Sequence, residues 1–152
     1  MQKIETTQRF PINIDTAWDF FSSPHNLTQI TPPDIRFTVL SPTGEIKIYP
    51  GMFIEYTTTL IAGITIPWVT EITHVSEKKY FVDEQRIGPF SIWHHQHHFE
   101  TIEGGIEIKD IVHWKSPAGI FGNILNKLFI NNKLHHVFRY RQEMTQKIFG
   151  TM

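Results

Sequence analysis

The hydrophobic pattern of this 152-residue chain is mostly strand-like as far as Trp114 and becomes helical in the C-terminal part. As far as Trp114, most segments alternate apolar and polar residues between Gly, Pro and polar turns, which predicts strands. The predicted strands are 2–10, 35–40, 52–60, 68–75, 78–86, 90–100 and 105–114. From 120 to 149 the spacing of apolar residues becomes helical, which predicts a long helix, continuous or divided at Asn131-Asn132. The residues at helical spacing are Ile130, Leu134, Val137, Met144 and Ile148. Strands followed by a helix favour an α+β fold with an antiparallel sheet.

Two short helices are expected between the first two strands. Asp15 is a good N-cap for the first helix, which carries Trp18, Phe20 and Phe21. Ser23-Pro24 ends that helix and suits the start of the second, because Ser caps well and Pro fits the first helical position. A curved sheet around one long amphipathic helix can enclose a cavity, whose volume depends on side-chain packing that the periodicity does not predict.

Composition excludes several classes of protein. The length suits one domain, 1–152, and nothing in the chain looks like a linker or a repeat. A net charge of −1 argues against non-specific nucleic-acid binding, and the absence of Cys excludes disulfides and thiolate chemistry. The longest apolar stretch, 60–69, is too short to span a bilayer and contains Gly and Pro. We therefore expect a cytoplasmic protein without membrane insertion.

Aromatic residues and histidines are unusually frequent, with 12 Phe, 4 Trp, 4 Tyr and 9 His. The strand 90–100 contains four of these histidines, and side chains alternate between the two faces of a strand. The predicted inner face carries Trp93, His95, His97 and Phe99. The predicted outer face carries His94, Gln96, His98 and Glu100. Only His95 and His97 are therefore candidates for an interior site.

An acid on the next strand is predicted to face these two rings. Matching the apolar faces places Asp110 inside, opposite His97 if Glu103-Gly104 is a two-residue turn, or opposite His95 after a register change. Such an acid can fix a His tautomer and create a general base or a polar anchor. It can equally be a satisfied buried pair with a structural role only. A metal held by His95, His97 and Asp110 is a less favoured alternative, and we assign no metal and no cofactor.

The chain resembles the SRPBCC superfamily (START-like, birch-pollen-allergen-like), in its polyketide cyclase and coenzyme-Q-binding branch. The resemblance covers nearly the whole chain and is carried by the segments 67–72, 81–85, 88–90, 93–100, 110–112 and 138–141. Trp114 stands where the family pattern has Tyr. The resemblance implies a helix-grip fold, in which a seven-stranded antiparallel sheet surrounds the C-terminal helix. It also implies a deep apolar cavity for lipids, quinones, polyketides or similar molecules.

We therefore expect a protein that binds a hydrophobic small molecule between the sheet and the helix. His95, His97 and Asp110 would hold the ligand's polar end. The expected lining from the sheet is Ile54, Tyr56, Trp68, Thr70, Ile72, Trp93, Phe99 and Val112. The expected helical lid is Leu128, Phe129, Leu134, Val137 and Phe138. The alternatives are a cyclase or dehydratase that uses a His-Asp pair, and an interaction module with a filled interior. Asp83 and Gln85 stay open candidates, because the length of the Gly88-Pro89 turn does not fix their face.

Overall fold

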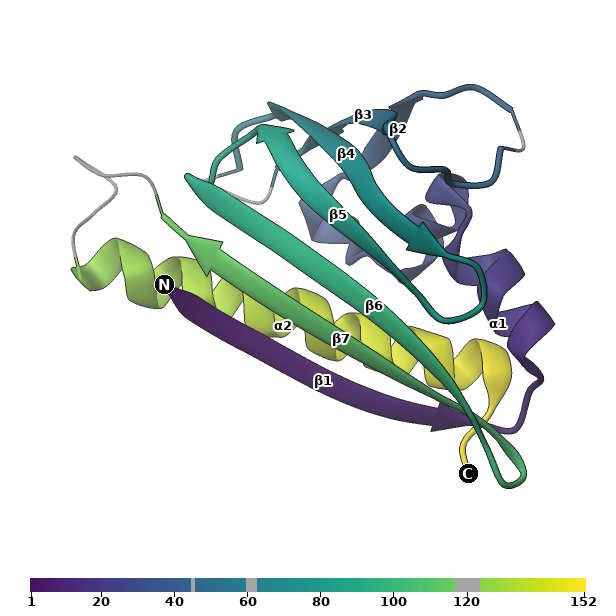
Figure 1. Ribbon diagram of the computed structural model, residues 1–152. Helices are drawn as coiled ribbons and strands as arrows, with labels where there is room; N and C mark the ends of the chain where they lie inside the picture. Colours follow the sequence, from purple (N-terminus) through teal and green to yellow (C-terminus); the bar gives the residue numbers. More distant parts are fainter. Residues whose placement is uncertain (45, 60–62, 117–123) are drawn as a thin grey trace.

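The fold is a seven-stranded antiparallel sheet with one long helix on one face, as the sequence predicted (Figure 1). The computed structural model describes residues 1–44, 46–59, 63–116 and 124–152, with the side chains of the last segment from residue 128 onward. The strand order is β1-β7-β6-β5-β4-β3-β2. The strands are β1 (Gln2–Phe10), β2 (Thr38–Ser41), β3 (Met52–Thr58), β4 (Ile66–Ser76), β5 (Tyr80–Ile87), β6 (Ile92–Ile102) and β7 (Gly105–Lys115).

The β6–β7 hairpin fixes the register in the centre of the sheet. Ile102 pairs with Gly105, so Glu103-Gly104 is the expected two-residue turn, and Gly104 adopts a positive φ of 81°, which glycine reaches without strain. A Cβ on Gly105 would collide with the carbonyl oxygen of Phe10, so a glycine lets β1 end close to the turn. With this register Asp110 lies opposite His97, which confirms the first of the two predicted pairings.

The long helix, α2 (Ile124–Phe149), runs across the inner face of the sheet, behind β1, β7 and β6 in Figure 1. It continues through Asn131-Asn132 without a break. The predicted start at residue 120 lies outside the described residues. The buried positions of the helix are Ile130, Leu134, Phe138 and Thr145. Ile148 was expected among these buried positions but is 41% exposed. The buried residues follow one another at steps of four, four and seven residues, and this spacing places Thr145 on the inner side of the helix.

The segment between β1 and β2 differs in detail from the prediction. Helix α1 (Ile14–Phe21) is capped by Asn13 rather than Asp15, since Asn13 Oδ1 accepts a hydrogen bond of 2.8 Å from the Thr16 N–H. The second helix is a 3₁₀ helix, η1 (Pro24–Ile30), and a further turn, η2 (Pro33–Ile35), follows it. The strand predicted from residue 35 therefore begins only at Thr38, after Arg36 in the left-handed region.

The N-cap can be tested by substitution. We expect Asn13→Ala to lower the free energy of unfolding by about 1 kcal/mol, because the Thr16 N–H loses its acceptor. Asn13→Ser should restore most of this stability. Urea denaturation followed by tryptophan fluorescence measures both variants. An equal loss in Asn13→Ser would show that the side-chain cap is not the origin of the effect.

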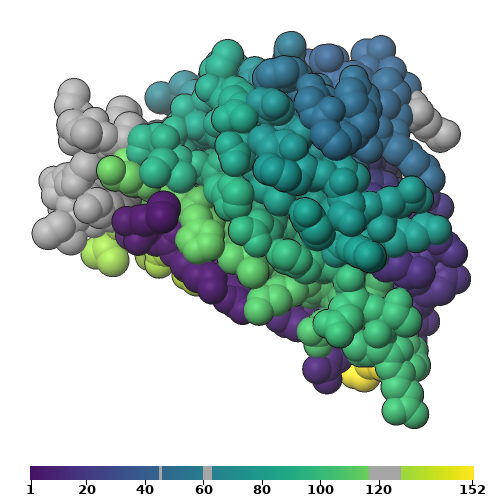
Figure 2. Space-filling model, viewed as in Figure 1, coloured from purple at the N-terminus to yellow at the C-terminus, as the bar shows by residue number. Residues whose placement is uncertain are grey.

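Two clusters of buried apolar residues fill the space between the layers. One joins α2 to β1 and β7 through Ile4, Val112, Trp114, Leu134 and Phe138, among others. The other packs α1 against the far end of the sheet, where Trp18 touches Phe81 and Phe99 edge to face. The opposite face of the sheet is turned to the reader in Figure 2. Among the helices that the structure describes, none has both the length and the apolar character needed to cross a membrane.

Candidate functional site

Four ionisable side chains meet on the inner face in the middle of the sheet. Asp83 comes from β5, His95 and His97 from β6, and Asp110 from β7. The register pairs Asp83 with His95 and Asp110 with His97, so all four point to the same side. Both histidines and Asp110 are less than 9% exposed, and Asp83 is only slightly more accessible. We call this group the His-Asp cluster.

Every ring nitrogen of the His-Asp cluster faces a carboxylate oxygen. Asp110 Oδ1 lies 3.0 Å from His95 Nε2 and 2.8 Å from His97 Nδ1. Asp83 Oδ2 lies 2.9 Å from His97 Nε2 and 3.4 Å from His95 Nδ1. The two rings are close to each other, with centroids 3.7 Å apart. The contact between His95 Nδ1 and Asp83 is therefore the longest of the four.

The environment separates the ionisation of the two histidines. Burial and the neighbouring charge of His97 lower the pKa of His95, against the pull of the carboxylates. Burial would also lower the pKa of His97, but hydrogen bonds to Asp110 and Asp83 outweigh it and raise that pKa. The surroundings therefore favour protonation of His97 over protonation of His95. A neutral His95 with its hydrogen on Nε2, toward Asp110, would turn the lone pair of Nδ1 toward Asp83.

Both aspartates are held as carboxylates. Burial would raise the pKa of Asp110, but hydrogen bonds from His95 and His97 outweigh it and hold that pKa well below its ordinary value. Burial likewise opposes the ionisation of Asp83, whose pKa is nevertheless lowered by the electrostatic interaction with His95 and by the hydrogen bond from His97. The environment thus favours the ionised form of both aspartates, and of the two rings His97 is the more readily protonated.

A pocket of about 150 Å³ lies beside the His-Asp cluster. It is small for a ligand pocket, which usually measures about 300 Å³ or more, because aromatic side chains fill much of the space between sheet and helix. The residues expected in the lining that do line it are Ile54, Tyr56, Trp68, Thr70, Ile72, Trp93, His95, His97, Leu134 and Val137. Asp83, left open by the sequence, also lines the pocket.

Several residues expected in the site lie elsewhere. Leu128 and Phe129 are 55% and 47% exposed, so they form no lid, because the helix turns these positions away from the sheet. Phe99, Val112 and Phe138 are buried in the two apolar clusters and do not line the pocket. Asp110 lies behind the two histidines and is likewise not part of the lining.

Gln85 has a structural role, because its side chain bonds to the backbone of Phe90. Its side-chain amide donates a hydrogen bond of 2.6 Å to the carbonyl oxygen of Phe90 and accepts one of 3.1 Å from the Phe90 N–H. These bonds connect the end of β5 to the segment before β6, and Gln85 does not line the pocket.

Several parts of the pocket wall were not predicted from the sequence, and two of them matter most for the site. The first is the segment from α1 to η1, which contributes Phe20, Phe21, Pro24, Leu27 and Ile30, among others. The second is Arg141 of α2, whose guanidinium lies 5.2 Å from the centre of the Phe138 ring. Arg141 Nε is buried and has no hydrogen-bond partner among the described residues. The position of Arg141 in the pocket wall could have been predicted, because it lies three residues after Phe138 and four before Thr145, on the inner side of the helix.

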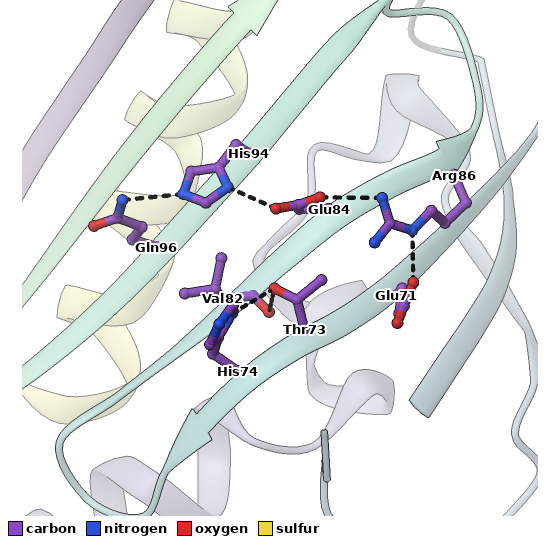
Figure 3. A network of polar contacts seen from close by, with 8 residues as sticks. All are labelled: Glu71, Thr73, His74, Val82, Glu84, Arg86, His94 and Gln96. Carbon is purple, nitrogen blue, oxygen red and sulfur yellow. Dashed lines mark hydrogen bonds and ion pairs between the residues drawn. The ribbon is translucent and has the colours of Figure 1, made fainter. Parts of the chain in front are cut away.

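The outer face of the sheet carries a separate polar network (Figure 3). Arg86 contacts Glu71 at 2.6 Å and Glu84 at 3.1 Å, and Glu84 contacts His94 at 3.0 Å. Gln96 continues the row from His94 to His98. The outer histidines are therefore partners of surface residues and do not belong to the interior site.

No family model matches the chain, and no curated protein matches it by sequence. Solved structures share its fold. Protein Ms6760 from Mycobacterium smegmatis superimposes with a TM-score of 0.67 at 17% identity, covering 96% of this chain and 89% of that one. Protein CV1439 from Chromobacterium violaceum has a TM-score of 0.67 at 7% identity over 100% of both chains. Ara h 8.0201 has a TM-score of 0.57 at 16% identity, covering 93% of this chain and 95% of that one. The chain has the helix-grip fold of birch-pollen-allergen-like proteins.

Proposed function

We propose that this protein binds a small hydrophobic molecule with one polar end in the pocket between the sheet, η1 and α2. The observation that carries the proposal is a pocket with mainly apolar and aromatic walls and buried charged groups on part of its lining. Pockets of this kind bind ligands through apolar contact and fix their orientation through a few polar groups. The fold is one that commonly encloses such ligands, which supports the proposal without naming the molecule.

The size of the pocket restricts the ligand. An apolar cavity of about 150 Å³ is enough to hold a benzene ring. Of the ligand classes that the family resemblance implies, the ring of a small quinone is nearest to this volume, whereas a multi-ring polyketide or an extended lipid chain would exceed it. Trp68 and Trp93 meet edge to face with ring centroids 5.2 Å apart and offer aromatic surfaces to such a ring.

The polar groups of the lining suit a hydroxyl or carbonyl on that ring. The lone pair of His95 Nδ1 and the Asp83 carboxylate can accept a hydrogen bond from the ligand. Arg141, from the opposite layer, can donate one, because its buried Nε has no partner among the described residues. Burial raises the pKa of Tyr56, so its hydroxyl stays neutral and pairs with Thr70 Oγ1 at 2.8 Å.

A second candidate function is catalysis by the same side chains. Asp110 accepts the Nε2–H of His95, which leaves Nδ1 as a base beside the pocket, and an oriented neutral imidazole is a typical general base. A cyclase or dehydratase reaction would use it to remove a proton from the ligand. Loss of turnover in His95→Gln with retained ligand binding would support this function over simple binding.

Two related probes test the binding function. We expect 2-naphthol to bind the full chain in the presence of EDTA, and naphthalene to bind about tenfold more weakly, because it lacks the hydroxyl that the charged groups recognise. Isothermal titration calorimetry measures both affinities. Equal affinities would contradict the proposed polar recognition, and the failure of both compounds to bind would contradict the proposed function.

A variant that fills the pocket locates the binding. We expect Val137→Phe to weaken 2-naphthol binding at least tenfold, because its ring would occupy the pocket. The added volume should also cost about 1–3 kcal/mol of stability. Ile148→Phe is the matched control, since Ile148 lies on the same helix, is exposed and does not line the pocket. Unchanged binding in Val137→Phe would place the probe elsewhere on the protein.

A further inference from the structure

Three side chains of the His-Asp cluster direct ligand atoms toward one point beside the pocket. Asp83 Oδ2, one nitrogen of His95 and one nitrogen of His97 lie within 4.8 Å of one another. The nitrogens nearest Asp83 Oδ2 are His97 Nε2 at 2.9 Å and His95 Nδ1 at 3.4 Å. Ligand atoms bound tetrahedrally to Zn²⁺ at about 2.1 Å lie about 3.4 Å apart, so the three groups need only small movements to share an ion.

Asp110 orients both rings from the side away from this point. Its Oδ1 faces His95 Nε2 and His97 Nδ1, which are the nitrogens opposite those nearest Asp83. Both rings therefore have an N–H partner behind them and can offer a lone pair in front. Histidines that bind metals usually donate their second N–H to a carboxylate in this way, which fixes the tautomer and the ring orientation.

The two contacts with Asp83 differ in length. Asp83 Oδ2 lies 2.9 Å from His97 Nε2 but 3.4 Å from His95 Nδ1, which is long for a hydrogen bond. A cation between the three atoms would bind one nitrogen of each ring and the carboxylate at once.

We infer that Asp83, His95 and His97 form a binding site for a divalent transition-metal ion in the wall of the pocket, with Asp110 as the positioning residue. Two imidazoles and one carboxylate suit Zn²⁺, Fe²⁺ or Co²⁺, whereas Mg²⁺ and Ca²⁺ prefer oxygen ligands alone. The three ligand residues line the pocket and Asp110 does not. The remaining coordination positions would therefore face the pocket, where water or a ligand could occupy them. The inference does not depend on the proposed function, because a metal can bind without an apolar ligand.

Cobalt titration of the full chain tests the site. After removal of metals with EDTA and of the EDTA itself, we expect one Co²⁺ per chain to bind, with the visible absorption of a four- or five-coordinate site. His95→Gln should weaken this binding about 100-fold or more. His94→Gln is the matched control, because His94 is the neighbouring residue on the outer face and should change the affinity less than threefold. Loss of binding in His94→Gln with retention in His95→Gln, or no binding at all, would overturn the inference.

A second measurement does not depend on a variant that folds. In the unmodified protein, Co²⁺ should shift or broaden the indole N–H signals of the pocket-lining residues Trp68 and Trp93 in the NMR spectrum. Effects confined to the outer-face residues, such as His94 and His98, would show an adventitious surface site and contradict the inference. The naphthol titrations contain EDTA and the cobalt titrations contain no naphthol, so either proposal can fail while the other holds.

Discussion

We expect Asp110→Asn to lower the free energy of unfolding by about 3–5 kcal/mol, because it removes the carboxylate that makes the shorter contact with His95 and the shortest contact with His97. Asp110 Oδ1 holds His95 Nε2 and His97 Nδ1 at 3.0 and 2.8 Å. An amide of the same shape carries no charge, so a protonated His97 would lose one of its two carboxylates in a buried position. Removing one partner of a buried ion pair typically costs about this much. It is a large share of the roughly 5–15 kcal/mol that stabilise a domain.

Urea denaturation at about pH 7 with EDTA, followed by tryptophan fluorescence, measures this loss. Glu107→Gln is the matched control on the same strand, because Glu107 pairs with Arg9 on the outer face and such exposed pairs contribute about 0–1 kcal/mol. Asp83→Asn should cost less than Asp110→Asn, since Asp83 borders the pocket and one of its contacts is long. A loss in Asp110→Asn no larger than that of the control would contradict a charged, buried cluster.

The centre of the site could be predicted because two strong local signals agree there. Alternation along β6 separates His95 and His97 from the outer histidines, and the two-residue turn at Glu103-Gly104 fixes which residue faces Asp110. Neither signal depends on distant parts of the chain. The order of strands and the change to a helical period in the C-terminal part likewise predicted the α+β fold and its antiparallel sheet.

Asp83 could not be assigned because its strand lacks such signals. Four residues separate the end of β5 at Ile87 from the start of β6 at Ile92, so the turn length does not fix the register. On its other side, the pairing of β5 with β4 contains two irregularities, one of them between Ile72 and His74. Each irregularity changes which residues share a face, so alternation alone cannot carry the assignment across the strand.

The helical wall was mispredicted for a different reason. Apolar residues occur on both sides of α2 near its start, so their presence suggested that Leu128 and Phe129 cover the pocket as a lid. In the structure both side chains are exposed. The inner stripe instead includes Thr145, which is fully buried and whose hydroxyl lies within hydrogen-bond distance of Gln8 Oε1 and of backbone carbonyls of its own helix. Packing against β1 decides this rotation of the helix, and such a tertiary contact is not visible in a pattern of apolar residues.

The wall formed by η1 and the volume of the pocket depend even more on packing. No periodic signal connects Leu27 and Ile30 of a 3₁₀ helix with Trp68 on a distant strand, although all three line the pocket. The aromatic surplus correctly indicated a lined interior. It could not show how far the rings fill it, because volume depends on how side chains interdigitate.

The His-Asp cluster should also make stability depend strongly on pH. The pKa values of Asp83 and Asp110 are lowered by folding, so their contribution is present above the unfolded value near 3.8 and is lost as pH falls through the folded pKa. The pKa of His97 is raised, so its contribution is complete below about pH 6.5 and is lost as pH rises through the folded pKa. The lowered pKa of His95 acts against the folded state as pH falls below about 6.5, because the unfolded ring takes up a proton first.

We therefore expect maximum stability near pH 6–7 and a steep loss below about pH 4. Each carboxylate that is protonated only in the unfolded chain adds about 1.4 kcal/mol per pH unit, so two give a slope of up to about 2.7 kcal/mol per pH unit.

Urea denaturation from about pH 8 to 3 with EDTA measures the slope. The measurements use about 0.3 M salt, which weakens exposed ion pairs and so reduces their share of the slope. Glu5 forms such pairs, because Lys109 and Lys3 lower its pKa to about 2. Asp110→Asn should remove about half of the acid slope, because one of the two carboxylates is gone, whereas Glu107→Gln should leave it unchanged. An equal slope in Asp110→Asn and the unmodified protein would show that acid lability arises outside the cluster.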